Sequence, residues 1–579
     1  MRRLWAYMRR YRARYLAGGL CLFATATLAM AIPLLLKRAI DAIGAGAPLG
    51  RVGALALAIV GIALVQAVAR TFSRALIFNV GRDVEYDLRN DLFAHLQRLP
   101  LAYYQQQHTG DLMSRVVNDV TAVRMLLGPG VLNLVNTPLY YAYGLAIMLN
   151  LDARLTLVAL LPYPIVLGIV KHFSRRLMEA TLRVQEGLAD LSSLVQENLS
   201  GIHVVRAYTC ESIEIGRFAA LNADFKRCSM DLARLRGQIL PVMRTAVSLG
   251  TLAVLWYGGL RVSAGRLSLG DLVAFIGYLN LLAWPTMALG WMLSLLQRGR
   301  AAMSRLEYVF GTTPTICTPL DAVALPAVRG EVEFRDVEFA YRTPANGHRV
   351  LDGISFRVEP GQKLALVGRT GAGKSTIVAL LPRLFDVTGG QILLDGVDIR
   401  ALPLAQLRQA IGFVSQDPFL FSRSVRDNVR FGRDDADDAA VRSAARLAGV
   451  AADVDAFPRG YDTVVGERGI TLSGGQKQRL TLARAILVEP RVLVLDDALS
   501  SVDTRTERAI LGALRELTRT RTTIVIAHRI STIQDADVIA VVDDGRIVEF
   551  GDHAALVARD GLYADMLRQQ RLEEEIADL

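Results

Sequence analysis

The chain has 579 residues, of which 52% are hydrophobic, and it carries a formal net charge of +10. The apolar excess lies before residue 300, which excludes an ordinary soluble protein and predicts a membrane domain. The basic residues form no patch with interleaved aromatic residues, so we expect no nucleic acid as a partner. They gather instead before the first apolar run, and no acidic residue precedes Asp41. Such positive flanks stay on the cytoplasmic side of a membrane.

Six windows free of charged residues are long enough, or nearly so, for the ~20 residues of a spanning helix. They are 15–36, 52–69, 125–151, 155–170, 245–260 and 272–297. The fifth window gains length if 237–243 is included, which places Arg244 at the membrane edge. No small-residue cleavage site follows the first window, so we expect a retained helix and not a signal peptide.

The connections between these windows alternate between short and long. Those near 41–51, 152–154 and 261–271 are short, whereas 70–124 and 171–236 are long and charged, with apolar residues at helical spacing. We therefore expect the spans to continue as long helical arms into the cytoplasm, with both ends of the region cytoplasmic. Membrane lipids are expected partners.

The pattern changes near residue 330, where short β-branched strands begin to alternate with helical stretches. Expected strands are 332–334, 363–367, 392–394, 492–495, 523–526 and 538–542. A proline-containing stretch precedes them. The sequence predicts an all-α six-helix transmembrane domain over 1–310, a linker over 311–329, and an α/β P-loop nucleotide-binding domain over 330–579.

Residues 368–375, GRTGAGKS, lie between an apolar strand and a helical run, which is the context that a P-loop requires. Its glycines let backbone N–H groups close around phosphates at a helix N-terminus. Lys374 adds positive charge, and the Ser375 hydroxyl is suited to hold Mg²⁺. We therefore expect ATP to be bound by Gly368, Thr370, Gly371, Gly373, Lys374, Ser375 and Thr376.

Further candidates follow other strands of the same domain. Asp496 ends the apolar strand 492–496 and is suited to hold Mg²⁺, and Gln416 can reach the same metal and the attacking water. His528 either contacts the γ-phosphate or is a histidine satisfied at a strand end. Tyr341 either stacks on adenine or belongs to the core.

The order of Tyr341, GRTGAGKST, Gln416, LSGGQ at 472–476, Asp496, Ser-Ser-Val-Asp at 500–503 and His528 resembles the nucleotide-binding domain of ATP-binding cassette (ABC) exporters. The six-span region resembles their half-transporter arrangement, so the resemblance covers nearly the whole chain. It implies alternating access driven by ATP. It also implies that Ser473, Gly474, Gly475, Gln476 and Asp503 contact ATP across an interface with a second ABC chain. Segments near 103–110 and 208–215 would be coupling helices, with the 467–469 loop sensing them.

One residue departs from the family pattern. Hydrolytically competent members usually carry Glu after the strand-ending Asp, whereas this chain has Asp497, which is one methylene shorter. A displacement of ~1 Å can cost ~10²-fold in rate. We therefore expect Asp497, His528 and Gln416 to form a weakly hydrolytic site in one half of a heterodimer. A tolerated substitution in a symmetric homodimer is the alternative.

The sequence does not identify the substrate, although a hydrophobic or amphipathic drug or lipid fits the membrane half. Polar or aromatic residues in or near spans are candidates for its site, or alternatively pack between helices and at interfaces. They are Asn133, Asn136, Arg244, Asn280 and Trp284. A second function, an ATP-gated regulatory module without transport, also fits Asp497. The expected location is the bacterial inner membrane.

Overall fold

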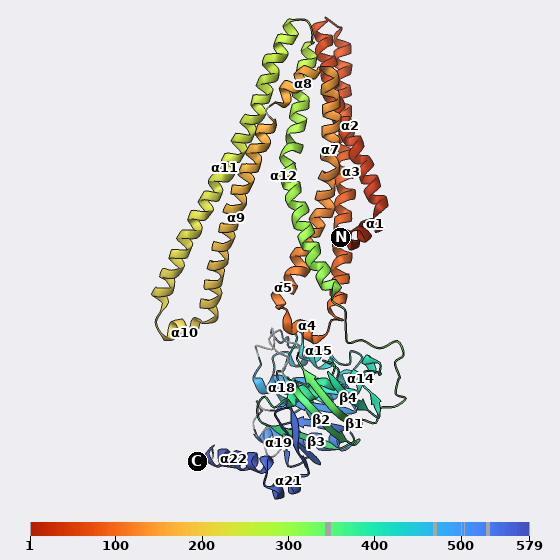
Figure 1. Ribbon diagram of the computed structural model, residues 1–579, viewed down its shortest axis with the longest axis vertical. Helices are drawn as coiled ribbons and strands as arrows, with labels where there is room; N and C mark the ends of the chain where they lie inside the picture. The colour runs from red at the N-terminus through yellow and green to blue at the C-terminus, as the bar shows by residue number, and fades with distance from the viewer. Residues whose placement is uncertain are drawn as a thin grey trace. The chain divides into compact units, whose positions relative to one another are not determined.

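The computed structural model describes residues 2–161, 163–341, 349–466, 472–499, 501–502, 504–527 and 533–577. The chain divides into two compact units. The first comprises Met1–Ala94 and Gly110–Gly311, and the second comprises His95–Thr109 and Thr312–Leu579. The described part of the first unit is helical, and the second is an α/β unit (Figure 1).

Five of the six predicted windows lie on helical segments of the first unit, and the fourth, 155–170, is divided between α8 and α9. Its helices are α1 (Arg2–Arg10), α2 (Arg12–Gly44), α3 (Leu49–Leu96), α5 (Thr109–Ser114), η1 (Arg115–Asp119), α6 (Val120–Met125), η2 (Leu126–Gly130), α7 (Val131–Leu151), α8 (Ala153–Leu160), α9 (Tyr163–Ser200), α10 (Ile202–Ala207), α11 (Glu211–Ser263) and α12 (Leu269–Gly311). Within the described residues, α2, α3 and α12 are each long and apolar enough to cross a membrane alone.

Several helices run far beyond their apolar windows, as the spacing of the long connections predicts. The helix α11 has 53 residues, and at 1.5 Å per residue it extends over about 80 Å, compared with a hydrocarbon core of about 30 Å. Figure 1 shows α9 and α11 side by side, joined by α10. The segment 208–215, predicted to couple to the nucleotide-binding domain, comprises the turn after α10 and the first residues of α11, which begins at Glu211. Its coupling role stays a prediction.

The second unit contains two sheets. A four-stranded antiparallel sheet has the order β2-β1-β4-β5, and a six-stranded sheet has the order β10-β9-β3-β8-β7-β6, parallel except for β10. The strands are β1 (Val332–Ala340), β2 (Arg349–Val358), β3 (Lys363–Gly368), β4 (Gly389–Leu394), β5 (Val397–Asp398), β6 (Ile411–Val414), β7 (Val492–Asp496), β8 (Thr522–Ile526), β9 (Val538–Asp543) and β10 (Arg546–Gly551).

The helices of the second unit cover the six-stranded sheet on both faces. They are α4 (Leu101–Gln106), α13 (Lys374–Leu380), α14 (Leu404–Ala410), α15 (Val425–Arg430), α16 (Asp438–Leu447), α17 (Ala451–Asp455), η3 (Gly460–Asp462), α18 (Gly474–Leu487), α19 (Thr504–Thr518), α21 (His553–Arg559) and α22 (Leu562–Ala577). Alternate residues of β7 enter different core clusters, Val494 on one face and Leu495 on the other. Burial on both faces explains why the parallel strands read as continuous apolar runs.

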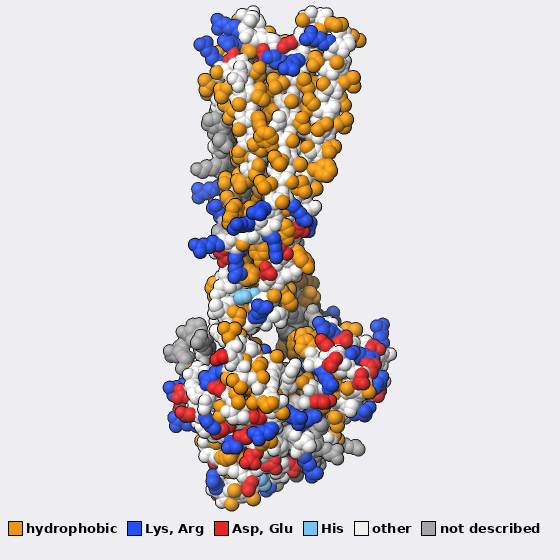
Figure 2. Space-filling view, turned by 90° about the vertical axis from the view of Figure 1, so that its right-hand side faces the viewer, with side chains coloured by type: hydrophobic (Ala, Val, Ile, Leu, Met, Phe, Trp, Pro, Cys, Tyr) orange, Lys and Arg blue, Asp and Glu red, His pale blue; other side chains and the backbone are white. Residues whose placement is uncertain are grey.

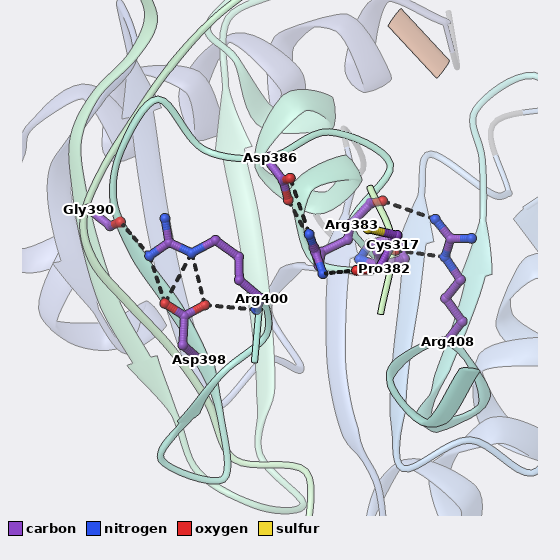
Figure 3. A network of polar contacts seen from close by, with 8 residues as sticks. All are labelled: Cys317, Pro382, Arg383, Asp386, Gly390, Asp398, Arg400 and Arg408. Atoms are coloured by element: carbon purple, nitrogen blue, oxygen red, sulfur yellow. Dashed lines mark hydrogen bonds and ion pairs between the residues drawn. The ribbon is translucent and has the colours of Figure 1, made fainter. Parts of the chain in front are cut away.

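Two segments from outside the sheet region belong to the second unit. Ala102 of α4 packs against the core cluster that contains β1. The connection after α12 is fixed by hydrogen bonds: the Arg383 guanidinium donates to the Cys317 carbonyl at 3.5 Å, and the Leu404 N–H donates to Thr318 Oγ1 at 3.1 Å. Figure 3 shows Arg383 between this carbonyl and Asp386, with Arg408 donating to the Pro382 and Arg383 carbonyls.

Candidate functional site

The predicted P-loop connects β3 to α13. Gly368, Gly371 and Gly373 have φ values of +150°, +86° and +101°, which side chains of L-residues rarely adopt. A Cβ on Gly368 would lie 2.1 Å from the Val542 carbonyl oxygen, and one on Gly373 would lie 2.8 Å from Leu351 Cδ2. The loop can therefore close as tightly as it does only with glycine at these two positions.

The loop wraps around the Lys374 side chain, which is 6% exposed. Its Nζ donates to the carbonyls of Gly368 at 2.7 Å and Arg369 at 2.8 Å. Burial lowers the pKa of Lys374, and the charges of Asp496 and Asp497 oppose this shift. A buried cation inside a glycine loop at a helix N-terminus fits a polyphosphate, which would supply the opposite charge.

Two of the predicted metal residues, Ser375 and Asp496, are in contact at the carboxyl end of a parallel strand, and Gln416 follows the end of the neighbouring strand. Ser375 Oγ donates to Asp496 Oδ1 at 3.0 Å, and the Asp496 side chain at the end of β7 is buried. Gln416 is exposed two residues after β6, which pairs in parallel with β7 through Val414 and Leu495. Hydroxyl, carboxylate and amide oxygens fit Mg²⁺. Ligands of open α/β sheets bind at this edge.

Asp497 follows directly and has a left-handed backbone, with φ of +48°. Its N–H donates to the Ile526 carbonyl of β8 at 3.1 Å. The conformation is one that Asp tolerates better than most residues. The Asp497 carboxylate lies near enough to Lys374 for its charge to act on that side chain. The structure thus brings Lys374, Ser375, Asp496 and Asp497 together.

The LSGGQ residues form the N-terminus of α18. Ser473 caps this helix in a capping box with Gln476: Ser473 Oγ accepts from the Gln476 N–H at 3.2 Å, and Gln476 Oε1 accepts from the Ser473 N–H at 3.1 Å. A Cβ on Gly475 would lie 2.9 Å from the Ser501 carbonyl oxygen. Ser473 and Gly474 are exposed, so the helix presents its N–H groups to an anion outside the unit.

Tyr341 lies beside the P-loop helix and also joins the core. Its hydroxyl is 3.1 Å from Thr376 Oγ1, and its ring meets Phe339 and Phe385 edge to face, with centroids 4.8 and 5.4 Å away. Its adenine contact stays a prediction. Thr370 is exposed in the loop. His528, Asp503 and the 467–469 loop lie outside the described residues.

The sequence analysis did not identify two side chains, Gln478 and Asp453, that support the residues of this site through hydrogen bonds. Buried Gln478 accepts from the Ser501 N–H at 2.9 Å and donates to the Asp497 carbonyl at 3.5 Å, so it links α18 to the residue after β7. Asp453 accepts from Gln476 at 3.0 Å and from Arg479 at 2.8 Å. A buried amide on the apolar face of α18 is the one signal that could have identified Gln478.

The described substrate candidates of the membrane half differ in burial and hydrogen bonding. Asn133 Nδ2 donates to the Pro129 carbonyl at 2.8 Å, within its own helical segment. Asn136 is half-buried, whereas Asn280 and Trp284 are exposed. The Arg244 side chain lies outside the described residues.

Comparisons with known proteins agree with this geometry. Residues 15–286 match the family described as ABC transporter transmembrane region, and residues 351–500 match the one described as ABC transporter. The multidrug resistance-like ATP-binding protein MdlA of Escherichia coli is 36% identical over 99% of this chain and 97% of its own. The ATP-dependent lipid A-core flippase of Syntrophus aciditrophicus is 34% identical over 100% and 95%. The structure of a bacterial Atm1-family ABC exporter with ATP bound aligns with a TM-score of 0.80 at 31% identity, covering 98% of this chain and 99% of that one.

Proposed function

The chain belongs to the ABC exporters, and from this premise we propose that it is one half of a heterodimeric pump for hydrophobic or amphipathic compounds, of the drug or lipid class. Exporters of this family are ATP-hydrolysing membrane proteins that work as dimers. Our proposal adds that the partner is a different ABC chain and that the site on this chain hydrolyses ATP slowly.

In this proposal each residue of the nucleotide site has a role. Lys374 and the P-loop backbone hold the β- and γ-phosphates, and Tyr341 supports the adenine. Ser375, Asp496 and Gln416 would hold Mg²⁺, which neutralises phosphate charge when bound. Asp497 orients the attacking water, together with His528 and Gln416. The exposed N-terminus of α18 completes the partner's site, with Asp503 at the same interface.

The observation that carries the heterodimer is Asp497. Its backbone is held by hydrogen bonds to β8 and to Gln478. The backbone therefore cannot shift easily toward the attacking water to compensate for the shorter side chain of Asp497. The P-loop, Ser375 and Asp496 all keep the family pattern, so this site is expected to bind ATP and Mg²⁺ even though it hydrolyses ATP slowly. The intact LSGGQ sequence would still complete a competent site on a partner that carries Glu.

Closure of two such nucleotide-binding units would reach the spans through the long helical arms. In this proposal the N-terminus and the 330–579 domain are cytoplasmic, and the membrane is the bacterial inner membrane. The compound must bind one orientation of the spans better than the other for this cycle to move it.

The proposal is tested by purifying the tagged chain from its native membrane and identifying what accompanies it. A second ABC chain at equal stoichiometry, together with ATP-dependent uptake of a fluorescent amphipath into inside-out vesicles, is the expected result. Recovery of this chain alone would establish a homodimer and refute the asymmetric site. A heterodimer that hydrolyses ATP but accumulates no compound would favour the regulatory module.

A further inference from the structure

Gln478 is a buried amide on the helix whose exposed end would serve the partner's nucleotide site. Charged side chains of the second unit are spread over its surface, as Figure 2 shows, whereas the Gln478 side chain is 2% exposed. It lies two residues after the LSGGQ sequence at 472–476. The start of α18 therefore carries both an exposed end that would meet the partner's ATP and a buried polar group directed into its own unit.

The Gln478 amide joins two segments that are both predicted to lie at nucleotide sites. Its Oε1 accepts from the Ser501 N–H at 2.9 Å, and its Nε2 donates to the Asp497 carbonyl over a longer distance of 3.5 Å. A side-chain amide satisfies this donor and this acceptor together, whereas a carboxylate can only accept. Asp497 is the residue predicted to orient the attacking water, and Ser501 lies two residues before Asp503, which is predicted to contact ATP across the interface.

The first turn of α18 also packs directly against Ser501. A Cβ on Gly475 would lie 2.9 Å from the Ser501 carbonyl oxygen, and one on Gly474 would lie 3.4 Å from Ser501 Cβ. The next side chain, Val502, is buried in the core cluster that also contains residues of α18. Because close-packed atoms transmit displacement, the end of α18 cannot move toward this segment without displacing Ser501.

Asp497 is held by a second contact, on the central sheet. Its N–H donates to the Ile526 carbonyl at 3.1 Å, and Ile526 belongs to β8, which lies between β3 and β7. A displacement of α18 therefore acts on the Asp497 peptide through Gln478, while β8 holds the end of the strand. Chains of packed groups and hydrogen bonds of this kind carry coupling between sites. A small displacement is sufficient, since ~1 Å at a reacting group can change a rate ~10²-fold.

We propose that Gln478 is a positioning residue that couples the two nucleotide sites of the dimer. When the partner's ATP binds the exposed N-terminus of α18, the Gln478 amide passes the movement of the helix to Ser501 and Asp497. The position of the Asp497 carboxylate then depends on whether the partner's site is occupied. The inference rests on the proposed ATP sites shared between two chains, and it adds the residue through which one site responds to the other.

The purified complex is assayed for ATP hydrolysis over a range of ATP concentrations, with Gln478→Met as the test variant. Met keeps the approximate size of the side chain and removes these two hydrogen bonds. Wild type is expected to show a Hill coefficient above unity and the variant a coefficient close to unity, because uncoupled sites bind independently. Turnover at saturating ATP should fall about fivefold or more, since coupling between sites typically amounts to a factor of roughly 5–150.

Thr481→Val is the matched control. Thr481 is also a buried polar residue of α18, and its Oγ1 donates to the Gln478 carbonyl within the helix at 2.8 Å. Its Hill coefficient and turnover should remain those of wild type. Thermal unfolding of both variants separates coupling from stability, because a purely structural role lowers the midpoint and leaves the Hill coefficient unchanged.

Equal Hill coefficients in wild type and Gln478→Met would overturn the proposal. If that variant does not assemble, amide exchange in the wild-type complex decides: the segment that contains Ser501 must gain protection when ATP binds, and unchanged exchange refutes the coupling. A wild-type complex that hydrolyses no ATP would refute the export function and this inference with it. Recovery of a homodimer would refute only the heterodimer, since two identical chains carry the same amide.

Discussion

At the residue scale, the position that decides the chemistry is Asp497. Asp497→Glu restores the missing methylene while the β8 and Gln478 contacts to the backbone remain. Because ~1 Å of misplacement can cost ~10²-fold, we expect ATP turnover at this site to rise about tenfold or more. The measurement is single-turnover hydrolysis by the reconstituted complex.

Asp497→Asn is the matched control, since it keeps the size and removes the base. In an asymmetric complex it should leave most turnover in place, because the partner's site carries it. If Asp497→Glu changes nothing and Asp497→Asn abolishes turnover, this site already hydrolyses normally and the asymmetry is wrong.

Lys374 gives a second prediction, on pH. Burial holds its pKa below the ordinary lysine value in the free protein, and bound phosphates would raise it again. Above the free-state pKa, nucleotide binding must therefore take up a proton, so ATP affinity should fall as pH rises through that value. Titration calorimetry in two buffers of different ionisation enthalpy measures the proton directly.

Arginine remains charged throughout this range. If Lys374→Arg binds ATP at all, its affinity should be flat over the same pH interval. An identical pH dependence in both proteins would assign the proton to another group.

At the element scale, the approach of α2 to α12 depends on Gly270. Its N–H donates to Asp41 Oδ1 at 3.1 Å, and a Cβ there would lie 2.5 Å from both that oxygen and the Lys37 carbonyl oxygen. The neighbouring ion pair between Lys37 of α2 and Asp271 of α12, at 2.5 Å, joins the same two helices. Gly270→Ala should therefore force the helices apart, at a cost of about 1–3 kcal/mol.

Gly290 on the same helix is the matched control, because a Cβ added there would meet no atom within 4 Å. Gly290→Ala should be neutral or slightly stabilising, by up to ~1 kcal/mol. Thermal unfolding of the purified complex compares the two variants. Equal midpoints would show that α2 and α12 do not constrain each other at this contact.

The elements that sequence predicts best are those with a strong local pattern. Four of the five parallel strands (β3, β7, β8 and β9) and the P-loop are predicted correctly, because continuous apolar runs and glycine spacing need no distant partner. The fifth, β6, is missed because it has only four residues, one of them Gly412. The strand β10 is missed because its residues are only half-buried or exposed, which weakens its apolar pattern. The short helix α10 is not predicted as a separate element, because the turn after it depends on backbone geometry at Thr209, with φ of +54°.

The part of the site that could not be predicted is held by tertiary contacts. Gln478 forms its hydrogen bonds to Ser501 and to the Asp497 carbonyl only after α18 packs beside β7. No local sequence pattern predicts these bonds. The two interpretations of Tyr341 remain for the same reason. The residues expected to bind ATP and Mg²⁺ can therefore be predicted from the sequence, whereas the side chains that hold them in position depend on tertiary contacts.

At the scale of the whole molecule, the two short helices between the long arms differ in their surroundings. Ala102 of α4 is packed within the nucleotide-binding unit. By contrast, α10 has no buried residue, and the Tyr208 side chain at its end is 76% exposed. Apolar side chains left uncovered at the tip of a long arm mark a surface that contacts another body.

We expect this body to be a nucleotide-binding unit, reached when the complex assembles. Tyr208→Ala should then lower transport per ATP hydrolysed by about thirtyfold or more, since a hot-spot aromatic typically contributes about 2 kcal/mol or more, while ATP affinity stays unchanged. Met230→Ala, an exposed residue further along α11, is the control. Uptake into vesicles is measured beside phosphate release, because the ratio of the two isolates coupling from catalysis. Equal ratios in wild type and Tyr208→Ala would mean that α10 transmits nothing, and that the motion reaches the spans through α4 alone.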